Sequence, residues 1–308
     1  MNIRPIFFVF LAASIGSCGR SGKQIPAHTR TIGVSLLTRG HMFYRDLEEG
    51  LNREAAKDNY ELVVSAGEFD LGKQVSQVED FIARRVDAIV VCPVDSKGIG
   101  PAIKKANDAK IPVFTADIAA EEGSVVCHIA SNNIAGGRLA GEFMAARLHG
   151  KGSIAIINQP VVTSVLDRVQ GFKEALAHHP DMKVVADVNG QGVRDKALQV
   201  ATDVLQANPH LDAIFGINDD SALGALDAAQ QFHRDNLIIV GYDAIPPARD
   251  AIMKGTQLKA DVVQNPTLIG ETTIQAIHDY FDGKKVPALL PVDVGIVDKD
   301  SLMQSSSH

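Results

Sequence analysis

Residues 213–243, AIFGINDDSALGALDAAQQFHRDNLIIVGYD, contain the repeating unit that decides the fold. An apolar run at 213–216 leads through a polar turn into a helical pattern from Ser221 to Phe232, and a second apolar run follows at 237–241. Short strands that alternate with helices of this length are typical of βαβ units, in which the strands are parallel. Because Val and Ile are nearly continuous in these runs, we expect the strands to be buried on both faces.

The same alternation extends toward the N-terminus. Further strands are predicted at 32–37, 61–65, 88–92, 113–116, 153–157 and 183–188, with helices at 43–59, 73–84, 98–109, 164–178 and 195–206. A single sheet with so many units would be large, and two similar halves that meet near residues 131–133 account for the number more simply. The sequence therefore predicts an α/β protein of two doubly wound parallel-sheet lobes.

Length, charge and hydropathy narrow the class of protein. The chain has 308 residues, of which 45% are hydrophobic and 22% charged, enough for two domains. Its 30 basic residues against 37 acidic ones give a net charge of −7, which argues against a nucleic-acid-binding surface. A mean hydropathy of +0.04 excludes a protein with many membrane spans.

The N-terminus has the layout of a secretory signal. Arg4 is followed by an apolar run at 5–15, which at about 11 residues is too short to span a bilayer. Residues 15–18 (IGSC) resemble a bacterial lipobox, in which Cys18 becomes the lipidated first residue of the mature chain. We therefore expect a signal peptide at 1–17 and a lipidated tether at 18–30; a plain signal with an incidental cysteine is the alternative.

The remaining cysteines and the histidines carry little functional information. Cys92 and Cys127 each stand within or beside a predicted buried strand, and we expect two separate thiols rather than a disulfide. No spacing of Cys and His residues predicts a metal site, and we expect no cofactor.

Polar and aromatic side chains follow the predicted strands, where ligands bind in open α/β sheets. Such exits lie at 38–44, 115–117, 217–220, 241–243 and 264–265. Carboxylates and amides suit the hydroxyl groups of a polyol, and an aromatic face suits its C–H groups. Because Asp and Asn at strand exits also cap helices, we expect Asp219 and Asp220 to be caps and Asn218 to contact the ligand, with capping as its alternative.

Seven short stretches, in this order and spacing, resemble one known family. They are 43–50 (FYRDLEEG), 93–96 (PVDS), 111–113 (IPV), 128–133 (HIASNN), 168–172 (RVQGF), 218–225 (NDDSALGA) and 240–243 (VGYD). Across about residues 31–298, the chain resembles the periplasmic sugar-binding proteins of the ribose-binding type, the extracytoplasmic receptors of ABC importers.

The resemblance implies two lobes joined by a hinge that the chain crosses several times. The N-terminal lobe would comprise 31–131 plus 264–291, and the C-terminal lobe 132–263 plus 292–303. Residues 292–297 would pair with the second lobe. A sugar would lie between the lobes, which close around it by hinge bending.

The resemblance also implies a set of ligand-binding residues. These are His41, Phe43, Tyr44, Asp117, Arg168, Asn218, Asp243 and Gln264. An arginine offers only donors and an aspartate only acceptors, so together they satisfy paired sugar hydroxyls. For Phe43 a place in the core is the alternative, because it begins a stripe of apolar residues at every fourth position.

Two departures from the ribose pattern leave the sugar open. Ribose binders have an arginine after the matched aspartate, where this chain has Ile118, and a family aromatic falls near Gly192. Arg39 or Arg45 are candidates to replace the missing cation. The identity of the ligand is therefore open: another aldopentose, a ketose or a related small polyol is an alternative to ribose.

The expected function is capture of a small monosaccharide by a monomeric, lipid-anchored protein of the periplasm or cell envelope, which delivers the sugar to an ABC permease in the inner membrane. The alternative is a receptor for a sugar or furanone-type signal that presents its closed form to a membrane sensor kinase. The same binding residues would serve both functions.

Other classes fit less well. The lactose-repressor family shares this fold but needs a DNA-binding helix-turn-helix where this chain has a signal and tether. A dehydrogenase would need Gly-x-Gly-x-x-Gly after the first strand, and residues 98–100 (GIG) lack the third glycine. With no nucleophile elbow either, we do not expect an enzyme.

Overall fold

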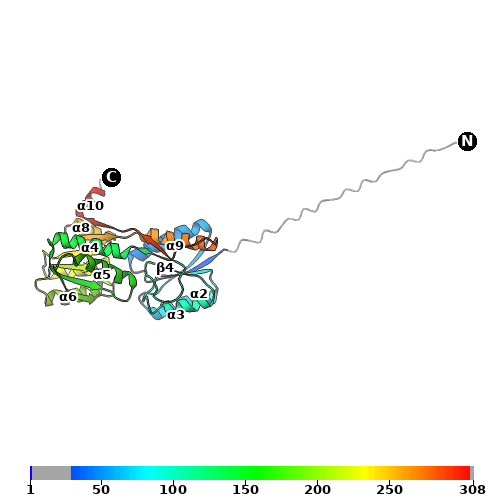
Figure 1. The fold of residues 1–308 in the computed structure, drawn as a ribbon, viewed down its shortest axis with the longest axis horizontal. Helices are drawn as coiled ribbons and strands as arrows, with labels where there is room; N and C mark the ends of the chain where they lie inside the picture. Colours follow the sequence, from blue (N-terminus) through cyan, green and yellow to red (C-terminus); the bar gives the residue numbers. More distant parts are fainter. Residues whose placement is uncertain (2–28, 306–308) are drawn as a thin grey trace.

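The computed structural model describes Met1 and residues 29–305, which form two α/β lobes side by side (Figure 1). The predicted lipidation site at Cys18, and all of the predicted signal peptide except Met1, lie outside the described residues.

The first lobe is a parallel six-stranded sheet in the order β11-β5-β4-β3-β1-β2. Its strands are β1 (Thr31–Leu36), β2 (Glu61–Ala66), β3 (Ala88–Val91), β4 (Val113–Ala116), β5 (His128–Ser131) and β11 (Leu289–Val292). Its helices are α1 (Met42–Ala55), the short η1 (Ala56–Asp58), α2 (Leu71–Arg84), α3 (Gly100–Asp108) and α9 (Pro266–Phe281).

The second lobe has the equivalent order, β12-β10-β9-β8-β6-β7, in which only β12 is antiparallel. The strands are β6 (Lys151–Asn158), β7 (Asp181–Asn189), β8 (Ala213–Gly216), β9 (Ile238–Asp243), β10 (Leu258–Val263) and β12 (Gly295–Asp298). The helices are α4 (Asn133–Arg147), α5 (Thr163–Leu176), α6 (Arg194–Ala207), α7 (Asp219–Gln231), α8 (Pro246–Met253) and α10 (Lys299–Ser305).

Strand burial follows the sequence pattern. Every residue of β3, β4 and β8 is buried, as the continuous Val and Ile runs predict. The edge strands β2 and β7 are partly exposed along most of their length. The prediction of two doubly wound parallel-sheet lobes is confirmed.

The chain passes between the lobes three times: from β5 to α4, from β10 to α9 and from β11 to β12. The expectation that residues 292–297 pair with the second lobe is wrong at its start. Val292 is the last residue of β11 and pairs with Ser131 in the first sheet, and pairing with the second sheet begins at Gly295. Val292 is 6% exposed, so its burial in the first lobe decides the register.

Helix α4 is an element that the apolar pattern does not predict. Its apolar residues are spread around the helix rather than gathered in one stripe. It packs against α5 at glycines: a Cβ on Gly137 would lie 2.0 Å from the Arg168 carbonyl oxygen, and one on Gly171 would lie 2.0 Å from that of Ile134. Only glycine allows these two backbones to come so close.

Two cysteines lie in the described part of the chain. Cys92 and Cys127 are buried and form no disulfide.

Candidate functional site

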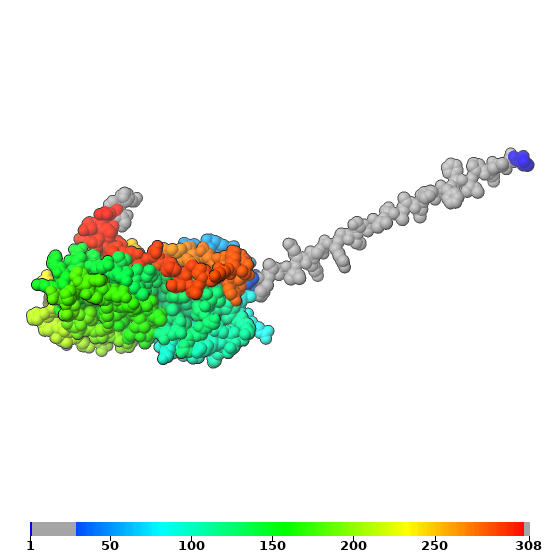
Figure 2. Space-filling model, in the orientation of Figure 1, coloured from blue at the N-terminus to red at the C-terminus, as the bar shows by residue number. Residues whose placement is uncertain are grey.

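A cavity lies between the two lobes, where the exits of the two sheets face each other. Its volume is about 30 Å³, so the cavity between the lobes is narrow. The lobes meet along a continuous seam on the face shown in Figure 2. All eight residues implied by the family resemblance line this cavity: His41, Phe43, Tyr44, Asp117, Arg168, Asn218, Asp243 and Gln264.

Asp117 presents its carboxylate to the cavity from a strained turn after β4. Its φ is +64°, and the Ile118 amide donates to the Ala116 carbonyl at 2.8 Å, which closes a three-residue turn. The Tyr44 hydroxyl donates to Oδ2 at 2.7 Å, whereas the buried Oδ1 has no protein partner. Strain of this kind persists where the surroundings hold it, and here it leaves one acceptor free in the cavity.

Phe43 and Tyr44 come from the first turn of α1. Their rings meet edge to face with centroids 5.2 Å apart, and both are about 95% buried. Each belongs to the apolar core of the first lobe and also forms part of the cavity wall. These two side chains therefore contribute to the apolar core and to the cavity wall at the same time.

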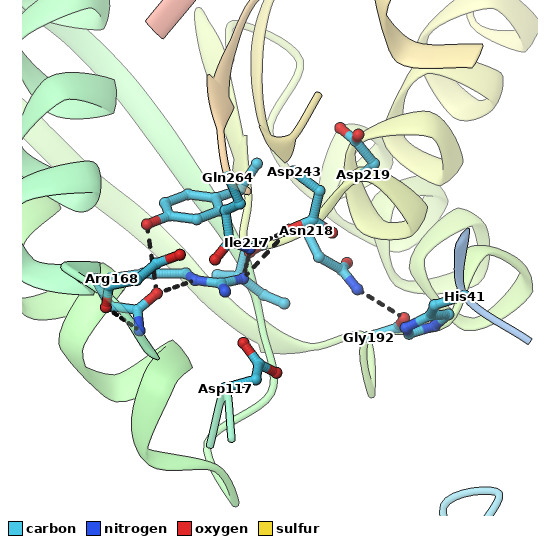
Figure 3. Close-up of polar contacts among 12 residues, drawn as sticks. His41, Asp117, Arg168, Gly192, Ile217, Asn218, Asp219, Asp243 and Gln264 are labelled. Carbon is cyan, nitrogen blue, oxygen red and sulfur yellow. Dashed lines mark hydrogen bonds and ion pairs between the residues drawn. The ribbon is translucent and has the colours of Figure 1, made fainter. Parts of the chain in front are cut away.

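Arg168 on α5 is the central cation of the site, and it is 4% exposed. Nε donates to Asn133 Oδ1 at 2.9 Å, and one terminal nitrogen donates to the Ile217 carbonyl at 2.8 Å (Figure 3). The guanidinium lies 3.9 Å from the centre of the Tyr242 ring, a cation–π contact. The Tyr242 hydroxyl donates to the same Asn133 oxygen at 3.3 Å, so one amide and one ring hold the guanidinium in place.

Asp243 and Gln264 complete the charged end of the cavity. Gln264 Nε2 donates to Asp243 Oδ1 at 2.6 Å, and Arg168 lies 3.9 Å from the same oxygen. Gln264 Oε1 is buried without a protein partner, so a second acceptor is free. Burial raises the pKa of Asp243 well above its ordinary value, and Arg168 opposes that shift.

Asn218 caps a helix, and both ends of its amide are engaged. Its Oδ1 accepts from the Ser221 amide at 2.9 Å, and its Nδ2 donates to the Gly192 carbonyl at 3.0 Å. The expectation that Asp219 and Asp220 are the caps is wrong, since they are the first two residues of α7 and Asn218 is its N-cap. Asn218 has the required extended backbone, with φ −149° and ψ 172°.

His41 of the first lobe reaches the second lobe. Its Nε2 lies 3.4 Å from Asp220 Oδ2, and its ring is hydrogen-bonded to the Gly192 carbonyl. Burial lowers the pKa of His41, and the Asp220 carboxylate partly restores it. This side chain therefore both lines the cavity and bridges the lobes (Figure 3).

The two departures from the ribose pattern have structural counterparts. Ile118 lines the cavity, and neither Arg39 nor Arg45 does: Arg39 is paired with Glu48 at 2.6 Å, and Arg45 is exposed. At Gly192, where φ is +67°, a Cβ would lie 2.4 Å from Gln159 Oε1. Gln159 therefore occupies the space that a side chain at position 192 would need.

Several residues that line the cavity were not predicted from the sequence. Gln159 directly follows β6, so applying the strand-exit rule to that strand would have found it. The others lie on a strand end, loop or helix turn and have no distinctive pattern: Leu37, Val162, Ser164 and Val165. The brace around Arg168, formed by Asn133 and Tyr242, also has no signal in the local sequence, because these residues meet only in the folded chain.

A buried pair of carboxyl groups lies beneath the charged end of the cavity. Asp219 Oδ1 and Asp261 Oδ2 are buried without a hydrogen-bond partner, and a Cβ on Gly241 would lie within 2.9 Å of each of them. The Ala244 and Ile245 amides donate to them at 3.1 and 2.7 Å. Burial raises the pKa of Asp219 well above its ordinary value and that of Asp261 to about 7, so the pair holds a proton more tightly than two free carboxyl groups do.

The cavity is suited to binding a polyhydroxyl molecule. Asp117 Oδ1 and Gln264 Oε1 offer acceptors, and the guanidinium of Arg168 offers donors. Burial raises the pKa of Asp117, and the charge of Arg168 lowers it in part. Among residues 29–305, we find no cluster of three or more metal-ligating side chains and no helix long and apolar enough to cross a membrane.

Comparison with known proteins places these features in context. Residues 32–285 match the family model described as a periplasmic binding protein domain. The chain is 36% identical over 271 residues to the ribose import binding protein of Salmonella typhimurium, covering 87% of this chain and 90% of the relative. It is 32% identical over 262 residues to a xylitol-binding protein of Mycolicibacterium smegmatis, covering 83% and 75%.

A solved structure agrees with the fold. A solute-binding protein of an ABC transporter from Mycobacterium smegmatis, with bound glycerol, has a TM-score of 0.85 and 30% identity. The match covers 90% of this chain and 96% of that one.

Proposed function

The chain belongs to the periplasmic binding protein family, and from that premise we propose that it captures a small monosaccharide or polyol between its lobes and delivers it, chemically unchanged, to an ABC permease. The observation that carries the proposal is the set of buried polar atoms left free around the cavity. Asp117 Oδ1 and Gln264 Oε1 lack protein partners, and a buried polar atom without a partner costs about 1–3 kcal/mol. Ligand hydroxyl groups would supply the missing hydrogen bonds.

The size and chemistry of the cavity favour a ribose-like pentose or a related sugar. A cavity of about 30 Å³ favours a small ligand over an oligosaccharide. The relatives named for ribose and for xylitol support the same size class. Ile118 and Gln159 make this cavity different from the ribose pattern, so we leave the choice among pentose, ketose and polyol to experiment.

A thermal-shift screen of the protein tests the proposal directly. The panel contains D-ribose, other aldopentoses, hexoses, ketoses, xylitol and other polyols. A ligand at 100 times its Kd stabilises the folded state by roughly 2.7 kcal/mol, which raises the melting temperature measurably. One strong hit supports sugar capture. A panel with no hit contradicts it and favours the signal-receptor alternative, in which the closed form addresses a sensor kinase.

We propose that ligand capture is coupled to hinge closure between two bodies, residues 31–131 with 264–292 and residues 132–263 with 295–303. Ligand groups from both bodies line the cavity, so a sugar that contacts both favours the closed arrangement. One cavity is shared between the two lobes of a single chain, which is consistent with a monomer that needs no second copy to complete its site.

We also propose that the mature protein is anchored in the periplasm or cell envelope through a lipid on Cys18. Residues 15–18 support this, because they match the order of a lipobox behind a short apolar run. Replacing Cys18 by serine should release the protein from the membrane fraction. Unchanged membrane retention of that variant would contradict the lipid anchor.

A further inference from the structure

The side chain of Thr163, the first residue of α5, is hydrogen-bonded to the opposite lobe. Its hydroxyl oxygen accepts from the Ala119 amide at 3.1 Å and donates to the Ala119 carbonyl at 3.3 Å. It also accepts from the Ser96 hydroxyl at 3.4 Å. One donor and two acceptor sites are all that a threonine hydroxyl has, and the first lobe satisfies all three.

The N-terminus of α5 is also capped from the opposite lobe. Its N-cap residue is Val162, which cannot accept a hydrogen bond through its side chain, so the helix has no cap of its own. Instead, the Thr163 amide donates to the Ser96 hydroxyl at 3.0 Å, and the Ser96 amide donates to the Val161 carbonyl at 3.1 Å. Ser96 is 1% exposed, whereas Thr163 and Ala119 are partly exposed.

These contacts link the turn that carries Asp117 with the helix that carries Arg168, the main acceptor and the main donor of the cavity. Ala119 stands two residues after Asp117, and Thr163 lies on the same helix as Arg168. Ser96, Ala119 and Thr163 do not line the cavity. A contact network that joins the two clamping elements without reaching the ligand acts on the arrangement of the lobes and not on sugar recognition.

We infer that Thr163 is a latch: with Ser96 and Ala119, it holds the lobes in the closed arrangement and so lengthens the lifetime of the bound ligand. The latch bonds span the lobes, so hinge opening breaks all of them together. When the lobes separate, the first amide of α5 loses its cap. Water then replaces the three partners of the Thr163 hydroxyl. Thr163 is a positioning residue, because it acts through the hinge. Its effect on a ligand rests on the proposed function.

The latch should change affinity through the population of the closed state. A ligand that binds the closed form has an apparent Kd that rises as the closed fraction falls. Loss of the latch hydroxyl should weaken binding roughly fivefold, which corresponds to the net value of a typical intramolecular hydrogen bond. Because the latch is formed after the ligand enters, the change should appear in the dissociation rate.

The first test compares Thr163→Val with Thr163→Ser and with Ser153→Ala in the full chain. Valine keeps the shape of threonine without its hydroxyl, and serine restores the hydroxyl. Ser153 is a matched control, since its hydroxyl donates to His210 at 2.9 Å and to Asp212 at 3.0 Å within the second lobe. Stopped-flow dissociation is measured with D-ribose and xylitol as probes, and the melting temperature without sugar shows that each variant is folded.

We expect Thr163→Val to dissociate roughly fivefold faster with little change in association rate, whereas Thr163→Ser and Ser153→Ala stay within about twofold of the parent. Dissociation of Thr163→Val at the parent rate overturns the latch. Equal losses in Thr163→Val and Ser153→Ala overturn it as well, because both would then report a general loss of packing.

The second test does not depend on the identity of the sugar. The Ser96 and Thr163 hydroxyl oxygens lie 3.4 Å apart, so cysteines at both positions should form a disulfide when the lobes close. Ser96→Cys with Thr163→Cys is compared with Ser96→Cys with Ser153→Cys, each carrying Cys18→Ser and treated with oxidised glutathione. The native Cys92 and Cys127 are buried.

Faster cross-linking at 96 and 163 than in the control pair supports the latch, with or without sugar. Cross-linking no faster than in the control pair overturns it. If the 96–163 pair cross-links but no sugar of the panel stabilises the protein, the proposed sugar specificity fails and the latch stands. The two proposals can therefore fail separately.

Discussion

The two lobes share one strand order, yet they hold their cavity residues by different forces. In the first lobe, Phe43 and Tyr44 are part of the apolar core, and Asp117 has a single side-chain hydrogen bond, from Tyr44. In the second lobe, Arg168 is held by an amide, a carbonyl and an aromatic ring, and Asp243 is held by Gln264.

This difference separates binding from stability. A buried carboxylate in a mainly apolar wall costs free energy of desolvation, so its neutralisation should spare the fold. A buried cation in a polar network supports its partners, and its removal leaves them unpaired at a cost of several kcal/mol. Substitutions on the two sides of the cavity should therefore have equal effects on binding and unequal effects on stability.

Arg168→Met should have the largest effect. It removes the cation that contacts Asn133, Ile217 and Asp243, so we expect a loss of binding of at least 100-fold. The unfolding free energy should fall by about 3 kcal/mol, because the buried partners lose their donor. Titration calorimetry and urea unfolding measure the two effects. An unfolding free energy equal to that of the parent would contradict the expected difference in stability between the two lobes.

Asp117→Asn should weaken binding almost as much and leave the fold intact. The amide keeps the shape of the carboxylate but replaces one acceptor by a donor, so we expect a loss of about 50-fold. Because burial already raises the pKa of Asp117, removal of its charge should leave the melting temperature of the ligand-free protein equal or higher. A fall in stability like that of Arg168→Met would contradict this prediction.

Binding should weaken as the solution is acidified. Burial raises the pKa of Asp117 above its ordinary value, and only the ionised form accepts from ligand hydroxyls at both oxygens. As pH falls through that raised pKa, affinity should fall roughly tenfold per unit of pH below it. Measurement of Kd from pH 8 to pH 4.5 tests this, with Asp117→Asn as the control that loses the Asp117 contribution. An affinity that is flat or rises on acidification would contradict it.

The smallest effect is expected at the carboxyl pair in the second lobe. The pKa of Asp261 is about 7 in the folded protein against an ordinary value near 3.8, so the folded state binds the extra proton more tightly. The resulting stability is fully present below about pH 4 and is lost as pH rises through about 7.

Asp261→Asn should therefore raise the melting temperature at pH 8 by a few degrees and flatten its dependence between pH 5 and pH 8. The carboxyl pair does not line the cavity, so ligand affinity should change less than about threefold. A lower melting temperature at pH 8 in this variant would show that the charged pair stabilises the lobe, contrary to its burial.

Local patterns in the chain are enough to predict the two-lobe fold and the strand exits. Strands such as β3 and β8 are continuous apolar runs, and burial on both faces is the physical reason for that pattern. The helix α4 was not predicted, because its glycines serve a contact with α5 that exists only in the folded protein.

The candidate site was predicted in part, by a rule of position and by family likeness together. Asp117 follows β4 and Asp243 is the last residue of β9, so topology alone directs attention to them. The brace of Arg168 by Asn133 and Tyr242 joins residues up to 109 positions apart, and no local pattern encodes such a meeting.

What the sequence by itself determined is which residues are apolar, where strands alternate with helices, and which polar side chains follow a strand. Those properties depend on neighbours within one or two turns of chain. Only the tertiary structure decided that His41 reaches Asp220 and that the Thr163 hydroxyl is bonded to the opposite lobe. The physical reason is that a hydrogen bond depends on distance in space, and closure of the two lobes sets those distances.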